Sequence, residues 1–112
     1  MDFERTTNNK VVVLNVNLVR ATLKEAEEFK NQLMEEINIG NKKIVVNLSR
    51  CEFIDSTFLG SLVVALKKVT SSGGDLRLVG FKPAVSSMFE LTRMYRVFES
   101  YKSPEEAVKS FV

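Results

Sequence analysis

Three consecutive polar residues, Asp55-Ser56-Thr57, stand where a loop leads into a predicted helix, and they are the residues best placed for chemistry. At a helix start the hydroxyl of Ser56 can accept a hydrogen bond from an unpaired backbone amide, so we expect Ser56 to be the N-cap. A phosphate on that hydroxyl would meet free amides and the positive end of the helix dipole, which favours it by about 0.3–1 kcal/mol. Two interpretations follow: Ser56 is a phosphoacceptor, or it is only a cap.

The two neighbours of Ser56 have supporting roles in this candidate phosphosite. Asp55 can orient the Ser56 hydroxyl or assist a kinase that acts on it, or its charge can simply favour the same helix N-terminus. Thr57 carries the next hydroxyl along the chain and is the remaining acceptor worth testing if Ser56 is not modified.

The amino-acid composition excludes most of the residue combinations that enzymes use for catalysis. The sequence contains no histidine, so it has no Ser-His-Asp or Cys-His pair and no imidazole metal ligand. Its one cysteine, Cys51, cannot form an intrachain disulfide or a thiolate metal site, and we expect a buried, unreactive thiol there. Neither common glycine-rich phosphate loop is present. We therefore expect a protein that is not an enzyme and that holds no metal and no cofactor.

Length and charge limit the possible partners. A chain of 112 residues is the size of one domain, which we expect to span residues 1–112. The formal net charge of +2 is too mild to indicate nucleic acid binding. The longest apolar run, Leu62–Leu66, has five residues, far too few to span a membrane, and the N-terminus lacks a signal peptide's apolar segment. Because a lone thiol also fits a reducing compartment, we expect a cytoplasmic protein that binds neither nucleic acid nor membranes.

Around the candidate phosphosite, apolar periodicity predicts alternating strands and helices. Strands are expected at 1–7, 11–18, 44–48, 76–79 and 97–98, and helices at 22–39, 57–70, 83–94 and 104–112. A turn at Asn8-Asn9 can join the first two strands, of which the second should be buried on one side only. Capping boxes are expected at Thr22–Glu25 and Ser103–Glu106. The alternation predicts an α/β fold with parallel crossovers and an initial hairpin.

The segment Cys51–Gly60 resembles the signature of STAS domains, the anti-sigma factor antagonist family, in which an apolar pair precedes Asp-Ser-Ser/Thr-Gly-Leu-Gly. The resemblance extends over about residues 10–111, through the strand at Lys43–Leu48, the turn and strand at Gly73–Val79 and the helix at Pro83–Met94. It implies a mixed β-sheet with helices mainly packed on one side. It also implies that Ser56, the first serine after the aspartate, is the phosphorylated residue.

The resemblance implies a bacterial signalling protein that regulates transcription through protein–protein interaction. Such a protein binds an anti-sigma factor that is a serine kinase, is switched off when that kinase phosphorylates Ser56, and is reset by a serine phosphatase. The partner surface would comprise Phe58, Leu59, Gly60 and Ser61 at the start of the helix. Phe58 replaces the family's usual glycine, and it can cover apolar surface of the domain, obstruct a kinase loop or contact the partner. We expect the last of these, with Phe58 partly exposed.

A second departure from the family pattern leaves an alternative open. Family members tend to carry a Gly-x-Leu/Ile-Asp loop before the first helix, with the acid near the phosphoacceptor. The matching stretch here, Val19–Thr22, has neither the glycine nor the acid. The alternative function is a constitutive interaction subunit of a regulatory complex, without a working phosphoswitch.

Overall fold

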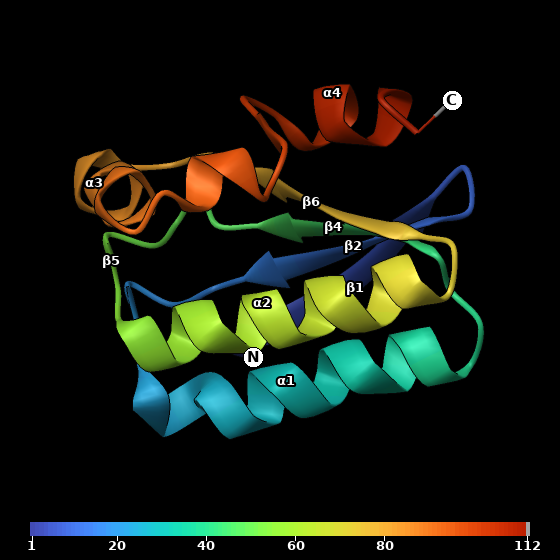
Figure 1. Cartoon of the computed structure of the whole chain (residues 1–112), viewed down its shortest axis with the longest axis horizontal. Helices are drawn as coiled ribbons and strands as arrows, with labels where there is room; N and C mark the ends of the chain where they lie inside the picture. Colours follow the sequence, from blue (N-terminus) through green and yellow to red (C-terminus); the bar gives the residue numbers. More distant parts are fainter. Residues whose placement is uncertain (112) are drawn as a thin grey trace.

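The architecture is a five-stranded mixed sheet in the order β1-β2-β4-β6-β7, seen in a computed structural model that describes residues 1–111 (Figure 1). Strand β1 (Phe3–Asn8) runs antiparallel to β2 (Val11–Val16). Strands β4 (Lys43–Asn47), β6 (Asp75–Val79) and β7 (Ser100–Tyr101) continue parallel to β2. The expected mixed sheet and its initial hairpin are thereby confirmed.

The hairpin turn depends on two residues in the left-handed region. Asn9 has φ of 51° and Lys10 has φ of 66°, and Asn8 pairs directly with Val11 across the turn. Two consecutive positive φ angles give a turn whose twist matches that of the flanking strands, and asparagine tolerates this conformation better than most residues.

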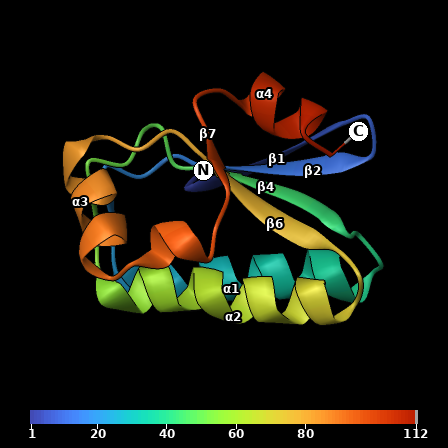
Figure 2. The same cartoon turned by 45° about the horizontal axis from the view of Figure 1, so that its top comes forward.

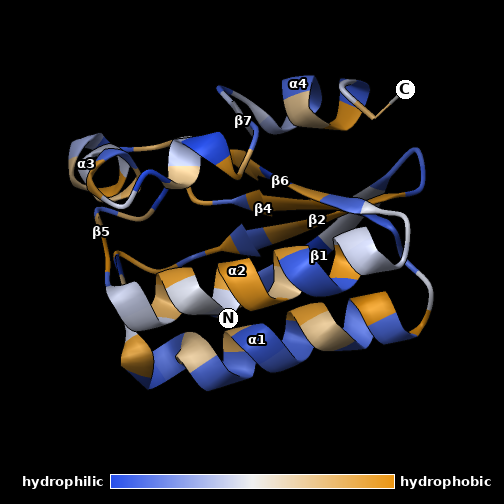
Figure 3. Ribbon diagram, in the orientation of Figure 1, coloured by the Kyte–Doolittle hydropathy of each residue, from blue (hydrophilic) through white to orange (hydrophobic). Residues whose placement is uncertain are grey.

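Helices α1 (Leu23–Asn38) and α2 (Ser56–Ser71) lie side by side across one face of the sheet (Figures 1 and 2). The central strands are mostly hydrophobic in Figure 3, whereas α1 alternates between hydrophilic and hydrophobic bands. Apolar residues three and four apart on α1 face the sheet, as the spacing predicts. Its buried residues are Ala26, Phe29, Leu33 and Ile37.

The opposite face of the sheet is covered in part by a short helix, α4 (Pro104–Lys109). Ala107 and Val108 of α4 form a second, smaller core with four valines of the sheet: Val11, Val13, Val45 and Val79. The expectation that the second strand is buried on one side only is therefore wrong, because α4 covers the side that carries Val11 and Val13. Val112, expected to pack with this helix, lies outside the described residues.

The segment between β6 and β7 folds into α3 (Pro83–Leu91) and a 3₁₀ turn, η1 (Met94–Arg96), beside the sheet (Figure 2). The strand expected at Val97-Phe98 is wrong. Val97 ends the 3₁₀ turn, and the buried Phe98 contacts Phe89 of α3 edge to face, with ring centroids 6.0 Å apart. Because Phe98 is committed to the core, strand pairing begins only at Ser100.

Candidate functional site

The loop that leads into α2 is fixed by a short two-stranded ladder. Strand β3 (Arg20–Ala21) pairs in parallel with β5 (Phe53–Ile54), and the Asp55 amide donates to the Ala21 carbonyl at 3.1 Å. The Arg20 guanidinium also lies over the Phe53 ring, 4.4 Å from its centroid. These contacts hold the segment before Ser56 against the segment before α1.

Asp55, and not Ser56, is the N-cap of α2. Its backbone is extended, with φ of −97° and ψ of 173°, and its Oδ1 accepts a hydrogen bond from the Phe58 amide at 2.8 Å. The expectation that Ser56 caps the helix is therefore wrong by one residue. The carboxylate reaches the third helical amide, so Ser56 becomes the first residue of the helix.

The second carboxylate oxygen of Asp55 reaches the other helix. Its Oδ2 accepts from the Leu23 amide, the first residue of α1, at 2.8 Å. The expected capping box of α1 is also present: Thr22 Oγ1 accepts from the Lys24 amide at 3.3 Å, and Glu25 Oε1 accepts from the Thr22 amide at 3.1 Å. One carboxylate therefore joins the N-termini of α1 and α2, where the helix dipoles favour negative charge.

Ser56 and Thr57 project away from this framework. Both side chains are exposed, and no hydrogen bond joins the Ser56 hydroxyl to any other residue in the range 1–111. The hydroxyl is thus presented to solvent from a rigid helix start.

Phe58 lies in the core, and the expectation that it is partly exposed is wrong. Its side chain is 0% exposed. Its ring stacks on Phe29 of α1, with centroids 4.3 Å apart and planes inclined by 15°. Phe29 in turn contacts Phe3 of β1 at 5.4 Å. The aromatic residue in place of the family's glycine therefore fills space between α1, α2 and the sheet.

Two more of the expected partner residues are also buried. Leu59 belongs to the core, and the Ser61 hydroxyl lies 3.3 Å from the Ala26 carbonyl oxygen, to which it donates across the α1–α2 contact. Only Gly60 of the four is near the surface. A Cβ placed on Gly60 would meet no atom within 4 Å, so nothing within the described chain requires a glycine there.

Comparison with known proteins now identifies the family. A model of the STAS domain matches residues 3–107. The chain belongs to the STAS domain family.

Relatives of this STAS domain have names that concern sigma-factor control. A Thermotoga maritima protein provisionally named an anti-sigma factor antagonist is 36% identical over 100 residues, which are 88% of each chain. A crystal structure of a protein so named from the same organism covers 96% of this chain and 92% of its own, with 34% identity and a TM-score of 0.90. The anti-sigma-B factor antagonist of Staphylococcus aureus is 30% identical over 94 residues, 82% of this chain and 84% of its own.

Two exposed apolar residues lie at the same end of the STAS domain as Ser56, and sequence reasoning missed both. Leu23, whose amide bonds to Asp55, is 69% exposed, although its spacing placed it on the buried stripe of α1. Val19, whose carbonyl accepts from the Glu52 and Phe53 amides, is 60% exposed. The available signal for Leu23 was its place directly after the N-cap, where a side chain can lie beyond the end of the core.

Cys51 is buried, as expected. Burial raises the pKa of its thiol to about 11, with a smaller opposing effect from Lys82. Because the thiolate is the nucleophile, low reactivity remains our prediction. A thiol reagent should label the native protein far more slowly than the unfolded chain, and equal rates would contradict it.

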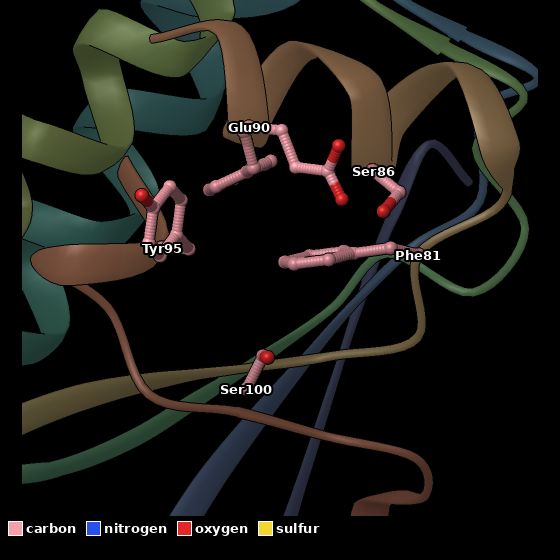
Figure 4. Close-up of a pocket in the computed structure, with 6 residues that line it drawn as sticks. Phe81, Ser86, Glu90, Tyr95 and Ser100 are labelled. Atoms are coloured by element: carbon pink, nitrogen blue, oxygen red, sulfur yellow. The ribbon is translucent and has the colours of Figure 1, made fainter. Parts of the chain in front are cut away.

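Other kinds of site are scarce in the described part of the chain. Within residues 1–111 there is no group of three His, Cys, Asp or Glu side chains that could hold a metal ion. No helix in the same range has the length and apolar character to cross a membrane. A hollow lined by aromatic side chains lies between α3, η1 and β7; Ser56 is not among its lining residues, which Figure 4 shows.

Proposed function

We propose that this STAS domain is an anti-sigma factor antagonist of the bacterial cytoplasm that binds its partner through the end of the molecule around Ser56. The partner is an anti-sigma factor of the serine-kinase type. Phosphorylation of Ser56 weakens the complex, and a serine phosphatase restores it. The names of the Thermotoga maritima and Staphylococcus aureus relatives support an anti-sigma factor as the partner.

The observation that carries this proposal is that Asp55 makes the structural hydrogen bonds at the start of α2, and the Ser56 side chain makes none. Asp55 uses both carboxylate oxygens to bond the Phe58 and Leu23 amides, so the framework does not depend on the serine. The Ser56 hydroxyl is exposed on the first turn of a helix. A residue in this position can be modified without loss of a structural hydrogen bond.

The proposed partner surface follows the outer side of α2 rather than the residues first expected. Ser56, Gly60 and Val64 are spaced by four, which places them on one face of the helix. Val64 is exposed, and Gly60 leaves room for close approach of another backbone. Val19 and Leu23 add exposed apolar side chains at the Ser56 end. Phe58, Leu59 and Ser61 support this surface from within.

A phosphate on Ser56 would act on the partner and not on the fold. It adds a charge of about −1.5 to −2 and three acceptor oxygens at a helix N-terminus, where free amides and the helix dipole stabilise it. On the outside, the same charge and its hydration would face an apolar strip centred on Gly60 and Val64. We therefore expect the phosphorylated protein to be as stable as the unmodified one and to bind the partner much more weakly.

In this scheme the domain itself supplies only the acceptor. The kinase binds ATP and transfers the γ-phosphoryl group of ATP to Ser56 Oγ, with release of ADP and of the hydroxyl proton. Hydrolysis by the phosphatase returns the serine and inorganic phosphate. No acid–base pair of this chain takes part.

The direct test is incubation with ATP and the serine-kinase anti-sigma factor of the same organism, followed by intact-mass measurement. The parent should gain the mass of one phosphoryl group, Thr57→Ala should gain the same, and Ser56→Ala should gain none. Phosphorylation of Ser56→Ala, or no phosphorylation of the parent by a kinase that binds it, would overturn the phosphoswitch.

One observation favours the alternative of a constitutive interaction subunit. Both Asp55 oxygens accept from backbone amides, and the stretch Val19–Thr22 contains no acid, so neither supplies a free carboxylate beside the Ser56 hydroxyl. Stable binding to the anti-sigma partner that ATP does not reverse would support this alternative.

A further inference from the structure

A groove opens to solvent between α3, η1 and β7, separate from the residues around Ser56 (Figure 4). It has a volume of about 580 Å³. Its lining residues are Phe81, Ser86, Phe89, Glu90, Tyr95 and Ser100. Nothing in the proposed sigma-factor function makes use of these side chains.

The aromatic wall of the groove is anchored to the core. Phe81 stacks on Phe89 with centroids 4.4 Å apart and planes inclined by 17°, and Phe89 contacts the buried Phe98 edge to face. Tyr95 stands on the opposite side of the groove in Figure 4, and it is 55% exposed. Two ring systems therefore line a space that remains open between them.

A carboxylate stands at the rim of the same groove. Figure 4 shows Glu90 extending from α3 with its oxygens near Ser86, above the Phe81 ring. Within residues 1–111, Glu90 takes part in no ion pair and no side-chain hydrogen bond. The cation closest to a groove ring is that of Arg96, 6.0 Å from the Tyr95 centroid, and Arg96 does not line the groove. The acid is thus left without a partner.

In another part of this chain, an aromatic ring and a carboxylate are both in contact with one arginine side chain. The Arg77 guanidinium lies 4.2 Å from the centroid of the Phe111 ring and pairs with Asp75 at 3.0 Å. A guanidinium suits such a place because its flat face stacks on a ring while its edge donates to a carboxylate. The groove has the rings and the carboxylate, and no guanidinium between them.

We propose that this groove receives an arginine side chain from a basic, partly apolar segment of a partner polypeptide. Stacking on Phe81 and Tyr95 would hold the guanidinium, and Glu90 would pair with it. A polypeptide fits better than a small cation because the groove is open and is flanked by further exposed apolar residues. Leu91 is 85% exposed, and Val97 is also exposed. Leu91 follows Glu90 directly in the chain, and Val97 lies two residues after Tyr95, so we expect these side chains to be available to the residues on either side of the arginine.

The test is an NMR titration of the isotope-labelled protein with the peptide acetyl-Leu-Arg-Leu-amide. The matched peptide replaces arginine by citrulline, which has nearly the same shape and no charge. The arginine peptide should shift backbone amide signals within residues 81–100 to saturation. The citrulline peptide should bind about tenfold more weakly or worse, since it lacks the charge-assisted pair.

Two variants locate the effect. Glu90→Gln should lower the affinity for the arginine peptide by about tenfold. Glu28 is an exposed acid on α1, and Glu28→Gln should leave that affinity unchanged. Equal binding of both peptides, undiminished binding by Glu90→Gln, or no saturable shifts within residues 81–100 would overturn the proposal. Equal affinity for acetyl-arginine-amide and for the tripeptide would overturn the assignment to a polypeptide.

Discussion

The two faces of α2 carry neighbouring residues of one short motif and do different work. The inner face holds Phe58, Leu59 and Ser61, all buried against α1 and the sheet. The outer face holds Ser56 and Gly60, which touch little of the chain. Substitutions on the inner face should therefore change the free energy of unfolding, and substitutions on the outer face should change affinity for the partner. The contrast shows that one short motif can hold both buried residues that pack the core and exposed residues that leave the fold unchanged.

The largest effect is expected at Phe58. Phe58→Ala removes a ring stacked on Phe29 and should lower the free energy of unfolding by about 3–5 kcal/mol, measured by urea denaturation. That is a large share of the ~5–15 kcal/mol typical of a domain. Phe58→Leu, which keeps most of the apolar volume, should cost less. A Phe58→Ala protein of parental stability that binds the partner weakly would place Phe58 on the contact surface after all.

A smaller effect is expected at Asp55, where the two helices meet. Asp55→Ala removes the acceptors for the Phe58 and Leu23 amides and should cost about 2 kcal/mol of unfolding free energy. Asp55→Asn keeps one carbonyl oxygen for the cap and should cost about half as much. Chemical denaturation of both variants beside the parent measures this. Equal losses in the two variants would mean that the cap bond to the Phe58 amide contributes nothing, and parental stability of Asp55→Asn would mean the same of the bond to the Leu23 amide.

At Gly60 a substitution should raise the free energy of unfolding rather than lower it. The added Cβ of Gly60→Ala meets no atom within 4 Å beyond the adjoining helix backbone, and the substitution should raise the free energy of unfolding by about 0.5–1 kcal/mol, because glycine is a poor helix former. If a partner approaches closely here, the same substitution should weaken its binding. Gly73→Ala is the matched control, since its φ of +86° should make alanine destabilising. Gly60→Ala that binds the anti-sigma partner as tightly as the parent would remove Gly60 from the contact surface.

The smallest change in stability is expected at Ser56. Ser56→Asp breaks no hydrogen bond within the described chain and places a negative charge in the first turn of α2. The free energy of unfolding should therefore rise by at most about 1 kcal/mol. Affinity for the anti-sigma partner should fall at least about tenfold, as measured by calorimetry. Asn31→Asp, on the exposed side of α1, adds the same charge elsewhere and should bind normally. Undiminished binding by Ser56→Asp would favour the constitutive subunit.

Local patterns predicted the framework well where neighbours in sequence are neighbours in space. The capping box at Thr22, the turn at Asn9 and the stripe from Ala26 to Ile37 all depend on residues a few positions apart. Strand–helix alternation likewise predicted the parallel crossovers and the initial hairpin, and the family resemblance implied the mixed sheet. The capping box and the stripe have their physical cause within a single helix, and the turn has its cause in two adjacent residues.

Other features depended on contacts that a local pattern does not contain. Whether Asp55 or Ser56 caps α2 is decided by one residue of register and by a bond to Leu23, thirty-two positions away. Phe58 shares its helix face with Leu62, and that spacing favours burial. We expected an exposed side chain instead, because the family usually has glycine at this position. The groove beside α3 joins side chains from Phe81 to Ser100 through tertiary packing alone.

The short helix α4 gives this domain a removable cover. Six residues are too few to hold a helix in water, so α4 persists only while Ala107 and Val108 rest on the four sheet valines and Ser110 accepts a hydrogen bond from Arg77 at 2.6 Å. Hydrogen exchange should therefore be faster in α4 than in the sheet beneath it. Each opening bares a strip of valine across β2, β4 and β6, which is the kind of surface that chaperones and other unfolded chains bind. A protease cut before Pro104 would make that exposure permanent, so the clipped domain should precipitate even though the larger core and the Ser56 end are intact.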